Sequence, residues 1–431
     1  MAALGPESGL GGGNGTLQAA REMTGRVPVS ARETKSAFYP LLSRMGLKIG
    51  AATLCRLSLN TARRFAYPFA PALGRGLNVP LSAVTSIIAV NQATGFLGFL
   101  FGPLADRFGY RGVMCAGLGM LALGMLVGGF FPYYTVVFIA LFLAGLGKSI
   151  FDPALQAYVG ERVPYERRAL VIGVLEMSWA GSTLVGIPLI GLGMERYGWR
   201  CPFFLLGGIG LLSVLAIRFL MPGEEREGRP PRVPSAKLSR AWRLLFRERA
   251  ALGTMGFAFL VSAANDNLFV IYGAWFEENF NLSVFALGLG TGIIGTAELL
   301  GETLTAAFSD RFGLKKAVIT GLTLSAVGYG ILPGLERTVS AALGGLFLIF
   351  LTFEFSIVTC LSLCTEILPP YRATMMASFL AAAGLGRAIG ALLGGTIWKV
   401  GSLEAVCLVS FSLTVLALVV LLWGLRGWRR A

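Results

Sequence analysis

The chain has 431 residues, of which 55% are hydrophobic and only 14% are charged, and it contains 58 glycines and no histidine. Soluble domains carry about 25% charged residues, so this composition excludes an ordinary soluble protein and indicates an integral membrane protein. The lack of histidine excludes metal sites and catalytic triads that need an imidazole, so any proton chemistry would use carboxylates, Lys, Tyr or Cys.

The first 45 residues are rich in Gly, Ser and charged residues, and the first long apolar run begins near Gly46. We expect residues 1–45 to form a flexible cytoplasmic tail. A signal peptide would place its apolar region within about the first 30 residues, so none is expected.

Apolar segments long enough to cross a bilayer recur along the rest of the chain. About 20 mostly apolar residues are needed to span the hydrocarbon core. This length predicts an all-α membrane protein with twelve transmembrane helices, at 50–73, 81–104, 112–131, 134–158, 168–192, 201–221, 250–276, 283–307, 315–333, 339–366, 373–397 and 403–424. An even number of spans places both termini on one side.

The distribution of basic residues predicts which side that is. Only five of the 37 Lys and Arg residues lie in loops on the side opposite the termini: Arg75, Arg196, Arg200, Arg337 and Lys399. Cytoplasmic loops carry an excess of Lys and Arg, so both termini are expected in the cytoplasm. The net charge of +14 then reflects membrane topology and not nucleic-acid binding.

A long hydrophilic stretch at 222–249 separates the first six spans from the last six. It begins with a Pro-, Gly- and charge-rich segment and continues with Leu238, Trp242 and Leu245 at helical spacing among basic residues, a pattern typical of a helix lying on an anionic membrane surface. We therefore predict a six-helix bundle at 46–221, a cytoplasmic linker with an interfacial helix, a second bundle at 250–425, and a basic cytoplasmic end at 426–431.

Two motifs occur once in each predicted bundle. Asp-Arg-Phe-Gly begins at Asp106 and again at Asp310, and the pattern Glu-x-x-Pro-x-x-Arg begins at Glu161 and again at Glu366. Both pairs are offset by roughly 204 residues, which indicates that the two halves are parallel structural repeats.

The first of these motifs resembles the loop signature of the major facilitator superfamily, G-x-L-A-D-R-x-G followed by basic residues. The resemblance implies two six-helix bundles that exchange access to a central site, and it implies that the motif acts as a gate. The gating residues would be Gly102, Asp106, Arg107, Gly109 and Arg111 in the first copy and Asp310, Arg311 and Gly313 in the second.

A second pattern is similar to the G-x-x-x-G-P-x-x-G-G motif of the superfamily's drug and proton antiporters. It runs from Gly181 to Gly191 but has an extra residue between Gly186 and Pro188. The alternative interpretation is a helix-packing face of small residues, bent by Pro188. Antiporters of this family commonly have an Arg where Leu141 stands, and the nearest cation here is Lys148.

Charged and strongly polar residues inside the spans are the candidates for substrate and proton binding, because charges within a bilayer are costly and usually functional. The net charge of these residues is positive in the first half and negative in the second. The candidates are Arg64, Asn60, Lys148, Asp152, Asn265, Asp266, Glu298, Glu302, Glu354 and Arg387.

Structural roles are the alternative for several of these residues. Lys148 and Asp152 stand one turn apart and could neutralise each other, and Asp266 could serve helix-to-helix hydrogen bonding. Arg56 is expected to reach the cytoplasmic surface. Glu298 and Glu302 share a helix face and repel when both are ionised, so we expect at least one carboxylate of the second half to exchange protons near neutral pH.

These patterns predict a secondary transporter that works by alternating access, with proton-coupled efflux of small amphipathic compounds as its function. Uptake or facilitated diffusion of a sugar, metabolite or lipid-like solute is the alternative, and a sensor or scaffold without transport is a remote one. We expect no enzyme activity, no metal and no cofactor beyond an ion gradient. The partners would be a small-molecule substrate and the lipid bilayer, without nucleic acid, for a monomer that crosses a bacterial cytoplasmic membrane many times.

Overall fold

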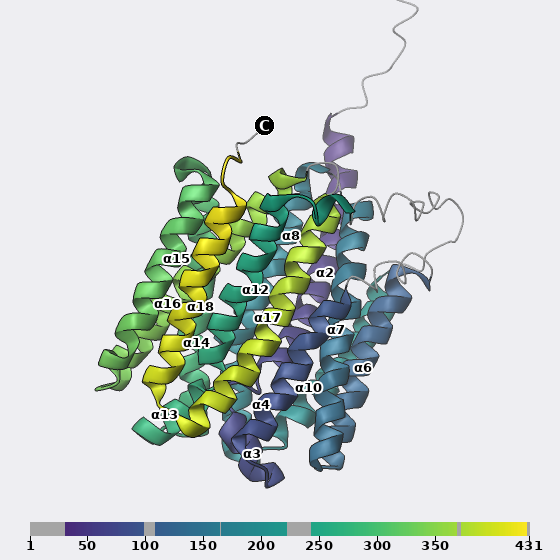
Figure 1. Ribbon diagram of the computed structural model, residues 1–431. Coiled ribbons are helices and arrows are strands. Elements are labelled where there is room, and N and C mark those ends of the chain that lie inside the picture. The colour runs from purple at the N-terminus through teal and green to yellow at the C-terminus, as the bar shows by residue number, and fades with distance from the viewer. Residues whose placement is uncertain (1–30, 99–107, 164, 222–242, 369–371, 429–431) are drawn as a thin grey trace, which may run out of the picture. The chain divides into compact units, whose positions relative to one another are not determined.

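The computed structural model describes residues 31–98, 108–163, 165–221, 243–368 and 372–428, and these residues are almost entirely helical. The chain divides into two units, Met1–Lys48 and Ile49–Ala431. In the first unit the described residues form the beginning of helix α2 (Ala31–Arg64), which continues into the second unit. In the second unit the long helices run side by side (Figure 1).

We call the described residues from 49 to 221 the N-terminal half and those from 243 to 428 the C-terminal half. After α2, the N-terminal half contains α3 (Ala70–Leu77), α4 (Leu81–Ala93), η1 (Thr94–Leu97), α6 (Tyr110–Phe130), α7 (Tyr134–Arg162), α8 (Tyr165–Gly181), η2 (Ser182–Gly186), α9 (Ile187–Tyr197) and α10 (Cys201–Leu220). The C-terminal half contains α12 (Arg249–Phe269), α13 (Tyr272–Phe280), α14 (Val284–Phe312), α15 (Leu314–Ile331), η3 (Leu332–Leu335), α16 (Val339–Ile367), α17 (Arg372–Val400) and α18 (Leu403–Gly424).

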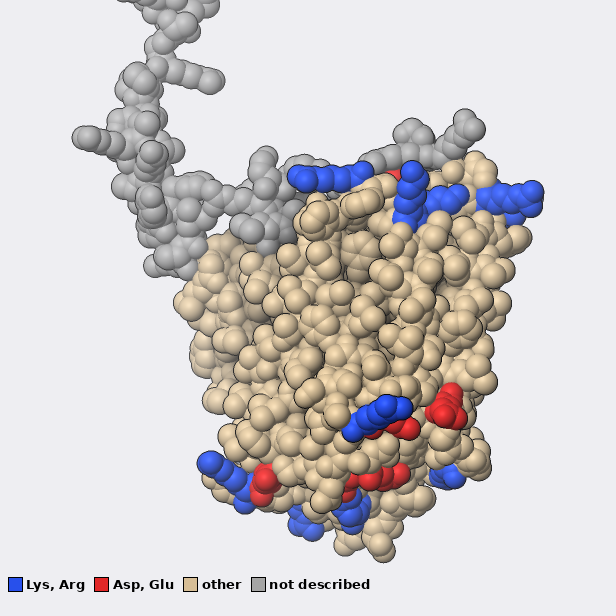
Figure 2. Space-filling model, turned by 90° about the vertical axis from the view of Figure 1, so that its left-hand side faces the viewer, with Lys and Arg blue, Asp and Glu red and all other residues tan. Residues whose placement is uncertain are grey.

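Within the described residues, ten helical segments are long and apolar enough to cross a membrane, and α3 with the following helix to Leu97, bent by 115°, makes an eleventh if the pair is one broken span and not a re-entrant loop. The ten correspond to the third to twelfth predicted spans. Figure 2 shows the expected surface, a broad band without Lys, Arg, Asp or Glu between two charged rims. The protein is therefore a multi-pass membrane protein, and the number twelve stays a prediction.

The first two predicted spans differ from the structure at their ends. The first was expected at 50–73, but α2 ends at Arg64 and carries three arginines in this region, so it is too polar to count by composition. Pro68 and Pro71 follow closely, and proline disfavours continuation of a helix across the residue before it. The second span was expected to reach residue 104, and its last part lies outside the described residues.

The Asp-Arg-Phe-Gly motif ends with the same backbone turn in both halves. Gly109 and Gly313 have φ values of 89° and 82°, and each directly precedes a helix, α6 or α15. A side chain would strain this left-handed conformation, which explains why both copies end with glycine. The two copies thus share a local structure as well as a sequence.

Small residues allow α12 and α17 to pack closely. Gly386, Gly390 and Gly394 are spaced by four residues along α17, and a β-carbon added at any of them would collide with the backbone of α12. Such stripes let helix backbones approach each other in membrane proteins. This packing also sets Arg387 on α17 beside Asp266 on α12.

The two ends of the second unit differ in how the halves meet. We call the end with the connections at 78–80, 198–200 and 281–283 the hairpin end, where α3 and α13 lie (Figure 1), and the opposite end, where α10 ends and α12 begins, the linker end. One buried apolar cluster includes residues of both halves, and its C-terminal members, such as Phe269, Trp275 and Phe350, lie from the middle of the helices toward the hairpin end. A separate cluster fills the C-terminal half toward the linker end.

Close contacts between the halves extend from the hairpin end to the middle of the helices. Gly288 of α14 packs against Pro188 and Gly191 of α9, and Glu195 accepts a hydrogen bond of 2.7 Å from the backbone N–H of Phe285. Arg75 pairs with Glu277 at the rim. The hairpin end is therefore sealed by backbone packing as well as by an ion pair.

Candidate functional site

A buried ion pair joins the two halves in the middle of the helices. Arg64, the last residue of α2, donates from Nη1 and Nη2 to the two carboxylate oxygens of Glu298 on α14, over 3.0 and 2.5 Å. Their side chains are only 5% and 2% exposed. Thr183 in η2 donates a further hydrogen bond of 2.7 Å to Glu298 Oε2. A bidentate pair of this kind is strong and geometrically specific.

A second carboxylate of the C-terminal half also contacts the region after α2. The hydroxyl of Tyr67 donates to Oδ1 of Asp266, and Arg387 Nε lies 4.0 Å from Oδ2. The ring of Tyr67 stacks on Phe269 with 4.5 Å between centroids. Asp266 therefore contributes to the interface between the halves, in addition to pairing within its own half.

The indole of Trp179 on α8 lies close to cationic side chains of both halves. The guanidinium carbons of Arg64 and Arg387 lie 4.4 and 4.9 Å from the ring centroid, and Lys148 Nζ lies 5.8 Å away. Cations within about 6 Å of an aromatic face are attracted by its quadrupole. Trp179 thus brings cationic groups of both halves together at one surface.

These groups line a small central cavity of about 20 Å³, enough for roughly one water molecule. The buried Asn265 has an amide oxygen without a hydrogen-bond partner among the described residues, so the cavity offers an open polar contact. The lining residues are Arg64, Tyr67, Gln92, Trp179, Asn265, Asp266, Phe269, Glu298, Phe353 and Arg387. Five predicted site residues therefore meet here, three of them carried by α12 and α17.

Three other predicted residues make polar contacts within the N-terminal half. Asp152 pairs with Lys148 over 2.5 Å and with Arg56 over 3.1 Å, and Arg56 also reaches Glu176 over 2.9 Å. Arg56 is thus buried, contrary to the prediction that it reaches the cytoplasmic surface, because two carboxylates hold it inside.

Asn60, the third of these residues, donates a hydrogen bond of 3.1 Å to the Ser178 hydroxyl of the same half.

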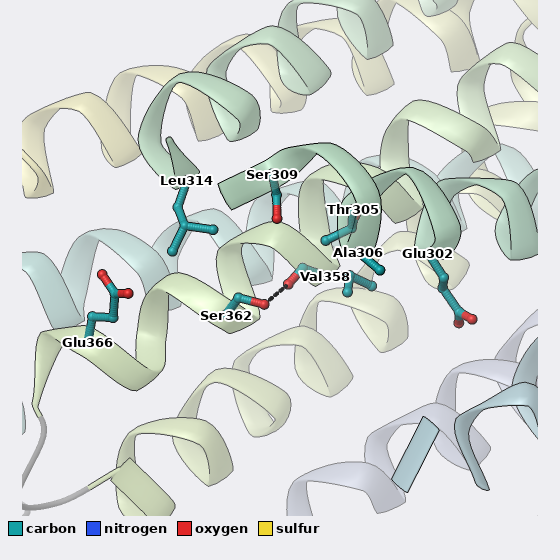
Figure 3. Close-up of a pocket in the computed structure, with 8 residues that line it drawn as sticks. All are labelled: Glu302, Thr305, Ala306, Ser309, Leu314, Val358, Ser362 and Glu366. Carbon is teal, nitrogen blue, oxygen red and sulfur yellow. Dashed lines mark hydrogen bonds between the residues drawn. The ribbon is translucent and has the colours of Figure 1, made fainter. Parts of the chain in front are cut away.

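The remaining two carboxylates lie on the linker side of the central ion pair. Glu354 on α16 is buried, and Glu302 stands one turn beyond Glu298 on α14. Glu302 also lines a second, more open cavity of about 350 Å³, whose lining residues are Glu302, Thr305, Ala306, Ser309, Leu314, Val358, Ser362 and Glu366. Figure 3 shows Glu302 and Glu366 at opposite ends of this row, with hydroxyl groups between them.

Only part of the predicted gating motif can be placed. Gly102, Asp106 and Arg107 lie outside the described residues, as does the side chain of Asp310. Gly109 and Gly313 form the turns described above. Arg111 donates a hydrogen bond of 3.4 Å to the carbonyl of Met221 after α10, and Arg311 is exposed at the end of α14.

Sequence reasoning missed several residues of this site. Trp179 and Thr183 stand in an apolar span and carry no charge, so a search for intramembrane charges passes over them. Gln92 could have been predicted as a site residue, because it is a polar residue in the second predicted span. Phe269 and Phe353 give no signal that separates them from ordinary apolar residues.

The family model of the Major Facilitator Superfamily matches this chain over residues 52–270 and 254–430. The chain belongs to this superfamily. Its members are transporters and not enzymes, and the protein is accordingly a secondary transporter of small molecules in a membrane.

Relatives and solved structures agree with this assignment. The chain is 25% identical over 301 residues to the uncharacterized MFS-type transporter YceJ of Bacillus subtilis, covering 70% of this chain and 76% of the relative. It is 28% identical over 243 residues to the class C tetracycline resistance protein of Escherichia coli, covering 55% and 60%.

Two solved transporters share the fold of this superfamily member at low sequence identity. The nucleoside transporter NupG matches with a TM-score of 0.74 and 13% identity, over 88% of this chain and all of that chain. A D-xylose-proton symporter matches with a TM-score of 0.70 and 18% identity, over 87% and 96%.

Proposed function

We propose that the protein is a proton-coupled exporter of small amphipathic compounds, which works by alternating access in a bacterial cytoplasmic membrane with both termini inside. The observation that carries this proposal is the buried ion pair of Arg64 and Glu298 between the two halves. The similarity of the chain to a protein named for tetracycline resistance supports export as the direction of transport.

The cavity lining supports an amphipathic substrate. Trp179, Phe269 and Phe353 provide apolar faces, while arginines and carboxylates of both halves provide polar contacts. In the present state the charged groups satisfy each other, and only about 20 Å³ is open. A substrate with an aromatic body and a polar group would replace contacts that the halves make with each other when the cavity widens.

Glu298 is the proposed proton-coupling group. A protonated Glu298 can no longer pair with Arg64 as an ion, and a buried charge left without its partner is strongly destabilising, by about 3–5 kcal/mol. Protonation and separation of the halves would therefore be thermodynamically linked. Glu302, one turn away, lines the larger cavity and offers a relay for protons, and Glu354 lies near both carboxylates.

The arrangement of the apolar core supports alternating access. The cluster shared by both halves reaches the hairpin end, whereas the C-terminal half has its own cluster at the linker end. The halves would therefore separate first at the linker end, which we assign to the cytoplasm, and opening of the hairpin end would require the contacts around Arg64 and Glu298 to break.

The test is proton flux in proteoliposomes containing a trapped pH-sensitive dye, with tetracycline and a panel of amphipathic compounds of both charge signs as probes. We expect at least one probe to drive proton movement, and Glu298→Gln to abolish this coupling. Flux that is indifferent to pH and to the combined Glu298→Gln, Glu302→Gln and Asp266→Asn changes would reject proton coupling. Accumulation of the probe along an inward proton gradient would indicate uptake and reject export.

A further inference from the structure

The fifth predicted span contains a turn that ordinary helices lack. Between α8 and α9, residues Ser182–Gly186 form the π-helical turn η2. A π turn holds one more residue than an α-helical turn and is frequently found at functional sites. This turn lies directly beside the central ion pair, because it contains Thr183.

The turn places two glycines on the same side of the helix. Gly181 and Gly186 are five residues apart, one more than in a G-x-x-x-G pattern, yet both face α2. A β-carbon at Gly181 would lie 3.2 Å from Leu57 Cδ1, and one at Gly186 would overlap the side chain of Thr61, one turn further along α2. In a regular α-helix five residues do not return to the same face, and the wider turn restores this alignment.

The same turn directs Thr183 to the other half. Its side chain is fully buried, and its hydroxyl lies 2.7 Å from Glu298 Oε2 and 3.0 Å from the carbonyl of Ala180. Gly295 of α14 permits this approach, because a β-carbon there would lie 2.9 Å from Thr183 Oγ1. The hydroxyl has a single hydrogen, and the negatively charged carboxylate is the stronger of the two acceptors.

The groups around Glu298 have opposite electrostatic effects on its carboxylate. Arg64 on α2 binds both carboxylate oxygens, while Glu302 on α14 and Glu354 on α16 place two further carboxyl groups nearby, which repel Glu298 when they are ionised. Thr183 is the uncharged donor to this carboxylate, and it approaches from the half that also carries Arg64. It therefore adds a second contact from the N-terminal half to the one that Arg64 makes with Glu298.

We propose that Thr183, placed by the π-helical turn, is a positioning residue that holds Glu298 in its pair with Arg64 and so keeps the hairpin end closed. The proposal rests on the alternating-access mechanism given above, but it depends neither on the coupling ion nor on the substrate.

The test measures how often the hairpin end opens. In a variant with all six cysteines replaced by alanine, Thr85→Cys serves as the reporter, because Thr85 is buried against Gly395 across the interface of the halves. A membrane-impermeant maleimide reacts with this cysteine only when the hairpin end opens. Labelling rates are compared for Thr183→Val, which removes the hydroxyl and keeps the side-chain shape, and Thr183→Ser, which retains the hydroxyl.

We expect Thr183→Val to increase the labelling rate about tenfold, the size expected for loss of a hydrogen bond to a charged group, and Thr183→Ser to label like the parent. Thr414→Val is the matched control, because Thr414 is equally buried and donates to a carbonyl of its own helix. Thr183→Ala is a second variant if the valine variant does not fold.

A double variant separates positioning from a general structural role. If Thr183 acts through the carboxylate, Thr183→Val adds no further increase when Glu298 is already replaced by Met. An unchanged rate in Thr183→Val, or an equal increase in the Glu298→Met background, would overturn the proposal. Labelling needs no proton gradient and no substrate, so its failure is distinct from failure of the flux experiment.

Discussion

Arg64 and Arg75 each form an ion pair between the same two halves, but in opposite environments. The side chains of Arg64 and Glu298 are 5% and 2% exposed, whereas those of Arg75 and Glu277 are 59% and 26% exposed. Water and salt screen the pair at the rim, so it contributes about 0–1 kcal/mol. The central pair is not screened, and loss of one partner leaves a buried charge.

Replacement of the two arginines should therefore affect stability very differently. Arg64→Met leaves Glu298 unpaired and is expected to destabilise the protein by about 3–5 kcal/mol, whereas Arg75→Met should stay within about 1 kcal/mol. Thermal unfolding of the purified protein in detergent, followed by tryptophan fluorescence, measures both. Equal shifts of the melting temperature would show that the central pair is not an important contact of this state.

The chain's intramembrane charges were predictable from its sequence, and their pairing was not. Arg64, Glu298 and Asp266 were identified because charges are rare in apolar spans. Arg64 pairs with a residue more than 200 positions away, and its choice among the carboxylates depends on how the helices pack. Thr183 became recognisable only through its distance to Glu298, because a threonine in a span usually bonds its own helix.

At the level of helices, the glycines spaced by four residues on α17 set how closely α17 packs on α12, and both helices carry residues of the central cavity. A β-carbon at Gly390 would lie 2.9 Å from Cα of Ala263 and closer still to its carbonyl oxygen, and this contact cannot relax without moving the α12 backbone. The helix that would move carries Asp266, and the helix that would push it carries Arg387. Packing of α12 on α17 therefore controls the geometry of one side of the cavity.

Gly390→Ala should lower the melting temperature, because overpacking costs about 1–3 kcal/mol. Gly208→Ala in α10 is the matched control, since a β-carbon there would meet no atom within 4 Å. An alanine in an open helical position is expected to be neutral or stabilising by roughly 0.5–1 kcal/mol. The same thermal unfolding measurement applies, and a stabilising effect at Gly390 would contradict the packing described for α12 and α17.

Helix boundaries were predictable where hydropathy changes sharply, and local irregularities were not. Helix α18 was expected at 403–424 and spans Leu403–Gly424, because turn-forming residues flank a long and mostly apolar run. The early end of α2 follows from prolines that a hydropathy search does not weigh. The π-helical turn depends on one additional residue in an otherwise regular helix, and only its packing against α2 reveals it.

At the scale of the whole second unit, the asymmetry between its ends matches the distribution of charge. The linker end carries exposed basic residues such as Arg243, Arg247 and Arg426. At the hairpin end, basic residues stand beside acidic ones, as in the pair of Arg75 and Glu277. Since cytoplasmic loops are enriched in Lys and Arg, the linker end should face the cytoplasm, and the sealed hairpin end should face outward.

Two matched cysteine variants test this orientation. Arg337 is exposed at the hairpin end and Arg426 at the linker end after α18, so Arg337→Cys and Arg426→Cys each exchange one exposed arginine in a background with the native cysteines replaced by alanine. In intact bacterial cells, a membrane-impermeant maleimide should label only Arg337→Cys, and Arg426→Cys should react once the membrane is permeabilised. The reverse pattern would place the termini outside the cell. The linker end, which carries Arg426, would then face outward, so the opening that we propose at the linker end would also lead outward and not into the cytoplasm.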